Sequence, residues 1–285
     1  MPRAALDRPP RAATLELIAT CALIVTLAMA GCTSAARHAE NVAAREGLTA
    51  TTVTGQPFLH RVFRNDAPSA GPLHIYIDGD GTPHPTPDTI AADPTPRHPL
   101  MLELLALDPH RGVYVGRPCY FALNDPACDA RYWTLRRFSG EVADSLITVI
   151  RAEERRAQIE HVQLFAHSGG AVLAWTLASR LPEVTAVVTV AGNLDVPAWT
   201  QLHGYTPLED APNPADLPIR REGFVALHYA GGKDANVPPS LIREAAARAG
   251  GEVIEIADFG HTCCWSRIWP EVLARLSAKD VAATP

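Results

Sequence analysis

The chain has 285 residues, of which 47% are hydrophobic and 20% are charged, and its formal net charge is −6 at pH 7. A disordered chain would be poorer in apolar residues and richer in charge, so we expect a globular protein with one large domain or at most two small ones. The acidic balance excludes a general basic surface of the kind that binds nucleic acid.

The first 31 residues are typical of a secretory signal peptide. Three arginines precede an apolar run over residues 17–30, and this run is shorter than the roughly 20 residues that a membrane-spanning helix needs. The run ends in Met29-Ala30-Gly31-Cys32, which resembles the lipobox of bacterial lipoproteins, except that Met29 stands where Leu is usual. The resemblance implies lipidation of Cys32, with palmitate or a similar acyl group, and attachment of the exported chain to the cell envelope. Because Thr33 replaces the Asp that signals retention in the inner membrane, we expect the outer membrane if the host is Gram-negative.

After a small, polar stretch at residues 32–56, which we interpret as a tether, residues 57–285 alternate between predicted strands and helices. Apolar or β-branched runs predict strands, and amphipathic periodicity predicts helices. The strands are expected at 73–77, 113–115, 162–165, 184–190, 224–229 and 253–256, and the helices at 100–107, 139–150, 171–180, 241–249 and 265–276. Pro-rich residues 82–99 are expected to form a loop, and residues 194–220 a cap-like insertion. This alternation predicts an α/β fold with a mainly parallel sheet flanked by helices.

The cysteines of the exported domain indicate a disulfide bond. An exported location permits such bonds. Cys119 and Cys128 flank a short loop, which favours a local bond between them. Cys263 and Cys264 are adjacent and are expected either to pair or to stay reduced. We expect no metal, since no C-x-x-C pair or histidine cluster with ligand spacing accompanies them.

Three polar residues each follow a separate predicted strand. Ser168 lies in Ala166-His167-Ser168-Gly169-Gly170, between a strand and a helix, where a sharp turn requires small neighbours. Asp234 and His261 follow the next-to-last and the last strands. A free serine is a weak nucleophile, so it needs a base and an acid that orients the base. Ser168, His261 and Asp234 are therefore the candidate nucleophile, base and acid.

The order Ser…Asp…His, the turn at Ser168 and the D-x-x-V-P pattern at Asp234 resemble the α/β-hydrolases, in particular bacterial esterase- and lipase-like members. The resemblance runs from about residue 73 to the C-terminal helix. It implies a serine hydrolase that acts on a small-molecule acyl substrate without a cofactor. It also implies an oxyanion hole formed by the N–H of Gly169 and an N–H of the loop after residues 73–77, which by position we expect to be that of Asp80. Ala166 replaces the first Gly of the family's turn motif.

The loop Asp78-Gly79-Asp80-Gly81 stands where many members of the family have His-Gly. With Thr82 it also fits the D-x-D-G-T motif of haloacid-dehalogenase-like phosphatases, in which Asp78 would attack phosphate with the help of Mg²⁺. A further alternative is a catalytically inactive, lipid-anchored binding domain. Asp195, which follows the strand at 184–190, is a rival to Asp234 as the acid of the triad.

Overall fold

The computed structural model describes residues 34–68 and 71–283 of the chain. The predicted signal peptide and Cys32 lie outside these residues. The compact folded body begins at Ala35. Within the described residues, none of the helices combines the length and the apolar character needed to cross a membrane.

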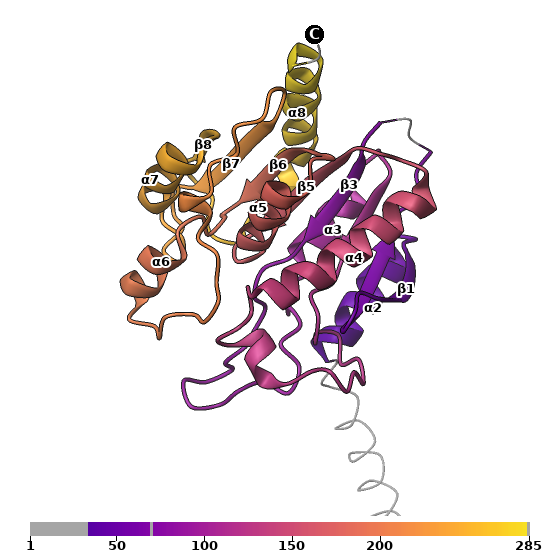
Figure 1. Cartoon of the computed structure of the whole chain (residues 1–285), viewed down its shortest axis with the longest axis vertical. Helices are drawn as coiled ribbons and strands as arrows, with labels where there is room; N and C mark the ends of the chain where they lie inside the picture. The colour runs from indigo at the N-terminus through magenta and orange to yellow at the C-terminus, as the bar shows by residue number, and fades with distance from the viewer. Residues whose placement is uncertain (1–33, 69–70, 284–285) are drawn as a thin grey trace, which may run out of the picture. The chain divides into compact units, whose positions relative to one another are not determined.

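A single eight-stranded sheet forms the centre of the body (Figure 1). Its strands lie in the order β1-β2-β4-β3-β5-β6-β7-β8. Their bounds are β1 Thr49–Thr54, β2 Leu59–Arg64, β3 Leu73–Ile77, β4 Gly112–Val115, β5 Val162–His167, β6 Val184–Val190, β7 Val225–Gly231 and β8 Glu252–Ile256. Strand β2 is antiparallel to both β1 and β4, and every other pairing is parallel. The predicted, mainly parallel sheet is confirmed, and β1 and β2 extend it beyond the six expected strands.

Helices cover both faces of the sheet. They are α2 Ala35–Arg45, α3 Leu100–Ala106, α4 Gly140–Ala157, α5 Gly170–Arg180, α6 Val196–His203, α7 Pro239–Ala249 and α8 Trp269–Ala283, with 3₁₀ turns at Ala130–Trp133, Pro214–Asp216 and Trp265–Ile268. Helices α4, α5 and α7 contribute to one core cluster, and α2, α3 and α8 to the other. Figure 1 shows α4 and α5 lying across the near face of the sheet.

The central strands are buried on both faces, as their apolar runs predict. All five residues of β3 are buried, and their side chains alternate between the two clusters: Ile75 and Ile77 contact one and Tyr76 contacts the other. The parallel register pairs Ile77 with Ala166 and His167 with Val190. The loops that follow these strands therefore emerge together at one edge of the sheet, where ligands bind in open α/β folds.

The segment expected to be a tether, residues 32–56, is largely part of the folded body. It contains α2 and β1, and four small residues of α2 are buried: Ala36, Ala39, Val42 and Ala43. Glu40 of the same helix forms an ion pair with Arg61 of β2 at 2.6 Å. The structured body thus starts about 20 residues before the expected boundary at residue 57, because alanines at helical spacing bury a face without looking apolar in the sequence.

The insertion at residues 194–220 folds into α6 and a 3₁₀ turn. Asp195 caps α6 by accepting a hydrogen bond from the N–H of Ala198. Trp199 of α6 is buried in the core cluster that contains α5. The insertion is therefore packed onto the body as a short cap.

Two disulfide bonds are present among the described residues. The predicted bond between Cys119 and Cys128 is present, with the two Cα atoms 5.4 Å apart. Cys263 and Cys264 form a bond between adjacent residues, which was one of the two outcomes expected for them.

Candidate active site

Ser168 lies on a tight turn between β5 and α5. Its φ is +50°, a left-handed conformation that is uncommon for residues other than glycine. The two glycines that follow have no room for a side chain. A Cβ on Gly170 would lie 2.6 Å from the carbonyl oxygens of Ile77 and Asp78, and one on Gly169 would overlap the carboxylate of Asp80. The small residues expected around Ser168 are thus required by close packing against the loop after β3.

The structure brings Ser168, His261 and Asp234 into one hydrogen-bonded chain. The Oγ of Ser168 lies 2.9 Å from Nε2 of His261, and Nδ1 of His261 lies 2.8 Å from Oδ2 of Asp234. The side chain of Asp234 is fully buried, and that of His261 is 20% exposed. We assign the ring proton to Nδ1, because a carboxylate can only accept it there. Nε2 then carries the lone pair that can accept the proton of Ser168.

The carboxylate of Asp234 is fixed by its own loop. Its Oδ1 accepts hydrogen bonds from the N–H groups of Asn236 at 2.8 Å and Val237 at 2.9 Å. Asp195, the rival acid, is engaged elsewhere, because it caps α6 and forms an ion pair with Arg248. Asp234 is therefore the carboxylate that contacts His261.

Asn236 is a site residue that the sequence reasoning missed. Its Nδ2 lies 3.0 Å from Nε2 of His261 and donates towards the same lone pair that faces Ser168. Its backbone carbonyl accepts hydrogen bonds from Trp199 at 3.1 Å and His203 at 2.7 Å. The insertion is thus connected to the loop that carries Asp234. The position of Asn236, two residues after the predicted acid, is the only sequence signal that could have found it.

His167 connects the loop after β3 to the backbone of His261. Its Nε2 lies 3.0 Å from the carbonyl oxygen of His261, and its Nδ1 lies 3.5 Å from Oδ1 of Asp78. The carboxylate of Asp78 is buried and accepts hydrogen bonds from the N–H groups of Gly79 and Met101. Asp78 therefore fixes the local backbone. These hydrogen bonds explain the buried carboxylate without phosphatase chemistry.

The two N–H groups expected in the oxyanion hole are available. In the part of the chain that the structure describes, the N–H groups of Asp80 and Gly169 have no hydrogen-bond acceptor. The N–H of Gly79, between Asp78 and Asp80, is already used by Oδ1 of Asp78 at 3.0 Å. In this loop the N–H of Asp80, and not that of Gly79, is thus left to donate.

The side chain of Asp80 is held by two arginines. Its Oδ1 accepts from Arg117 at 2.5 Å and its Oδ2 from Arg137 at 3.0 Å. Burial raises the pKa of the Asp80 carboxyl, but the charges and hydrogen bonds of Arg137 and Arg117 outweigh burial and lower it below its ordinary value. Asp80 is therefore ionised at neutral pH.

One group of side chains has the composition of a metal site, and it lies at the opposite edge of the sheet. It consists of His74 at the start of β3 and of Asp108 and His110 before β4. The carboxylate of Asp108 already accepts hydrogen bonds from His74 at 2.6 Å, from Tyr76 at 2.6 Å, and from the ring and the backbone of His110 at 2.9 Å. This network satisfies the buried carboxylate and explains the cluster without a metal.

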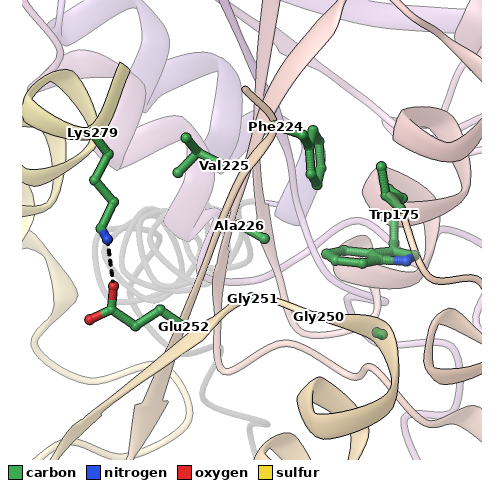
Figure 2. A pocket seen from close by; sticks show the side chains of 10 residues that line it. Trp175, Phe224, Val225, Ala226, Gly250, Gly251, Glu252 and Lys279 are labelled. Carbon is green, nitrogen blue, oxygen red and sulfur yellow. Dashed lines mark ion pairs between the residues drawn. The ribbon is translucent and has the colours of Figure 1, made fainter. Parts of the chain in front are cut away.

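Two pockets lie away from Ser168. Figure 2 shows a pocket of about 280 Å³ lined by Trp175, Phe224 and the first residues of β7 and β8, with the Lys279–Glu252 ion pair at its side. Since β7 and β8 are parallel strands whose carboxyl ends precede Asp234 and His261, this pocket lies at the other edge of the sheet. A second pocket, of about 340 Å³, lies between α6 and the start of α7.

Known proteins resemble this chain in structure and not in sequence. No family model matches the chain, and no curated protein matches it in sequence. A putative lipase from Acinetobacter baumannii is similar at a TM-score of 0.61 and 10% identity, over 88% of this chain and 98% of the lipase. A Pyrococcus furiosus esterase is similar at 0.58 and 10%, over 83% and 93%. A proline iminopeptidase-related protein from Thermus thermophilus is similar at 0.56 and 16%, over 83% and 98%.

These similarities show that the chain has the α/β-hydrolase fold. The order and direction of β3 to β8 and the helices on both faces are those of that fold. One fold supports many reactions, and the similar structures include both esterases and a peptidase-related protein. The reaction of this chain must therefore be argued from its own site.

Proposed function

We propose that this protein is a serine hydrolase that cleaves a carboxylic ester, or a related acyl bond, through a covalent acyl-enzyme. The observation that carries the proposal is the continuous chain of hydrogen bonds from Ser168 through His261 to Asp234, with distances of 2.9 and 2.8 Å. Such a chain activates a hydroxyl that is a poor nucleophile by itself. The similarity in fold to esterases and lipases supports the same interpretation.

The first half of the reaction acylates Ser168. Its Oγ attacks the carbonyl carbon of the ester while Nε2 of His261 takes the hydroxyl proton. Asp234 holds the ring in the required tautomer and stabilises the imidazolium that forms. His261 then gives the proton to the leaving alcohol, and the acyl group remains on Ser168. In the second half, a water molecule gives a proton to Nε2 of His261 and attacks the acyl carbon. The bond to Oγ then breaks, the carboxylic acid leaves, and His261 returns the proton to Ser168.

The negative charge that develops on the carbonyl oxygen needs donors that are already in place. The N–H groups of Gly169 and Asp80 supply them, and the amino end of the 11-residue helix α5 adds positive potential there. Removing one donor from an oxyanion hole typically costs about 10²–10³ in kcat.

A fluorophosphonate probe tests this proposal directly, because it bonds to an activated serine with loss of fluoride. The wild type should be labelled and should hydrolyse a series of acyl esters of graded chain length. The Ser168→Ala variant should do neither. If Ser168→Ala instead keeps a phosphate release that EDTA abolishes, the protein is a phosphatase that uses Asp78. If the wild type neither reacts with the probe nor cleaves any ester, it is a binding domain.

We further propose that lipid on Cys32 holds the enzyme at the cell envelope. The support is the short apolar run followed by Ala30-Gly31-Cys32. Labelled palmitate should be incorporated into the wild type and not into Cys32→Ser, and that variant should leave the membrane fraction or remain unprocessed. Membrane association that persists in Cys32→Ser, with no fatty acid on either form, would refute lipidation.

A further inference from the structure

An ionised carboxylate lies where the proposed mechanism needs positive potential. Asp80 supplies an N–H group to the oxyanion hole, and the overlap of its carboxylate with a Cβ built on Gly169 shows that the carboxylate packs against the residue after Ser168. A negative charge so close to a developing oxyanion destabilises it, because like charges repel strongly where water is excluded. The mechanism therefore requires a positively charged group that neutralises the carboxylate of Asp80.

Arg117 and Arg137 are placed to do so. Each donates to a different oxygen of the Asp80 carboxylate, at 2.5 and 3.0 Å. The side chain of Arg117 is 2% exposed and that of Arg137 is 12% exposed, so solvent screens neither charge well. One buried and one partly buried positive charge therefore face one negative charge, so Arg117, Arg137 and Asp80 together carry one net positive charge beside Ser168.

The same cluster holds the backbone of the loop after β3. The hydroxyl of Tyr120 donates to the carbonyl oxygen of Asp80 at 3.0 Å, and Arg117 donates to the carbonyl oxygen of Arg137 at 2.8 Å. The Arg117 guanidinium lies over the rings of Tyr120 and Phe138, at 5.2 and 5.3 Å from their centroids. With both the side chain and the carbonyl of Asp80 held, its peptide planes have little freedom to turn.

An unpartnered Nε is shared by three neighbouring arginines and does not by itself distinguish those at Asp80. The Nε atoms of Arg117, Arg136 and Arg137 are all buried without a hydrogen-bond partner among the described residues. What distinguishes Arg117 and Arg137 from Arg136 is their pairing with the carboxylate of Asp80.

Building on the proposed serine hydrolase function, we propose that Arg117 and Arg137 are positioning residues for oxyanion stabilisation. They hold the carboxylate of Asp80 against Gly169, so that the N–H of Asp80 stays directed at the oxyanion, and they cancel the charge of that carboxylate. Their effect passes through Asp80 and requires no contact with the substrate.

Arg137 is the residue to change, because it makes fewer contacts than Arg117 and is the less buried of the two. We expect Arg137→Gln to lower kcat for ester hydrolysis about 10-fold or more, with less than about a threefold change in KM, since an oxyanion forms only in the transition state. Arg137→Lys, which keeps the charge, should recover most of the loss. Arg136→Gln is the matched control, because Arg136 pairs with Glu141 and Asp210 and not with Asp80.

The decisive measurement is a double-mutant cycle with Asp80→Asn, which keeps the backbone N–H and removes the carboxylate charge. If Arg137 acts through Asp80, then Arg137→Gln should reduce kcat by less than about threefold in the Asp80→Asn background. Thermal unfolding of each variant shows whether the fold is retained. Equal losses of kcat in both backgrounds would overturn the proposal, because Arg137 would then act directly on the reacting groups.

Two other results also count against it. An increase in KM with an unchanged kcat would make Arg137 a substrate-binding residue and overturn the positioning role. An active, probe-labelled wild type whose kcat is unaffected by Arg137→Gln would refute this inference while leaving the serine hydrolase proposal intact. A wild type that is neither labelled nor active would refute both.

Discussion

Among the residues that the structure describes, two pairs of serine and histidine lie at hydrogen-bonding distance, and their distances alone would not tell them apart. Ser168 Oγ is 2.9 Å from Nε2 of His261, and Ser145 Oγ is 2.7 Å from Nε2 of His60. In both pairs the other ring nitrogen also has a partner. His261 faces the carboxylate of Asp234, whereas His60 faces the backbone carbonyl of Gly116 at 2.8 Å.

The surroundings of the two pairs differ in three respects. Ser145 and His60 are fully buried, whereas the ring of His261 is 20% exposed. Ser145 lies within the regular helix α4, whereas Ser168 lies on a left-handed turn. Burial lowers the pKa of His60 to about 4, so this ring stays neutral at physiological pH and makes a poor proton acceptor.

The comparison shows that a short Ser–His distance does not by itself identify a catalytic pair. Solvent access, a charged partner for the histidine and the backbone conformation of the serine are also needed. A carbonyl can orient an imidazole, but it does not carry the full negative charge that stabilises an imidazolium. The Ser145–His60 pair satisfies two buried polar groups. The Ser168–His261 pair has in addition an anion behind the ring and a route to solvent.

The largest predicted difference is in activity. Ser168→Ala should lower kcat for ester hydrolysis by about 10⁶-fold, since loss of the nucleophile removes the covalent route. Ser145→Ala should keep kcat within about threefold. Steady-state hydrolysis with labelling by the fluorophosphonate probe measures both. A large loss in Ser145→Ala at an unchanged unfolding temperature would contradict the assignment of the two pairs.

The next difference concerns the group behind each ring. Asp234→Asn should lower kcat by about 10⁴-fold, because an amide favours the wrong tautomer of His261. Asp195→Asn should cost much less, since Asp195 contacts α6 and Arg248. If Asp195→Asn gives the greater loss at an unchanged unfolding temperature, the acid has been misassigned.

The pH dependence of the free energy of unfolding should reveal the buried, neutral ring of His60. The folded-state pKa of His60 is about 4, below its ordinary value of 6.5, so its contribution to stability is complete above about pH 6.5 and is lost as the pH falls towards 4. The difference corresponds to about 3 kcal/mol. Denaturant unfolding between pH 7 and pH 4 should show a shallower decline for His60→Gln than for the wild type.

Two other histidines provide references for this measurement. His228 is equally buried, and burial also lowers its pKa to about 4, so part of the decline should remain in His60→Gln. His84 is exposed, and His84→Gln should follow the wild-type curve. Parallel curves for His60→Gln and the wild type would mean that His60 titrates normally in the folded protein.

The smallest predicted effect is on stability at neutral pH. Ser145→Ala leaves Nε2 of His60 without a partner in a buried position, which should lower the free energy of unfolding by about 1–3 kcal/mol. Thr148→Ala, on the solvent side of the same helix, is the matched control and should change it by less than about 0.5 kcal/mol. Equal effects for the two variants would show that the Ser145–His60 hydrogen bond contributes nothing.

The parts of the fold that could be predicted from the sequence are the buried strands made of consecutive apolar residues. Strands β3 to β7 are of this kind, whereas β8 reads EVIEI and has no buried residue, so that only its apolar residues predicted it. Strand β1 reads TATTVT and is half exposed, and β2 reads LHRVFR and carries two arginines, so neither looks like a core strand. Helix α2 buries mostly alanines. The spacing of Ala36, Ala39 and Ala43 was a usable helical signal that composition concealed.

The site divides in the same way. Ser168, Asp234 and His261 could be predicted because each follows a strand that is itself visible in the sequence. The arginines around Asp80 could not, because Arg117 and Arg137 are 37 and 57 residues away and lie in irregular segments. Their proximity depends on how the loops after β3 and β4 pack, which no local pattern encodes.

The early start of the folded body limits how far it can move from Cys32. Only residues 33 and 34 separate Cys32 from the first residue of α2, a span of about 10 Å at full extension. If Cys32 carries lipid as we propose, the body cannot swing away from the membrane as it would on a 25-residue tether. Its search for substrate is then nearly two-dimensional, so that esters held in or close to the same lipid surface are encountered far more often than those dissolved at a distance.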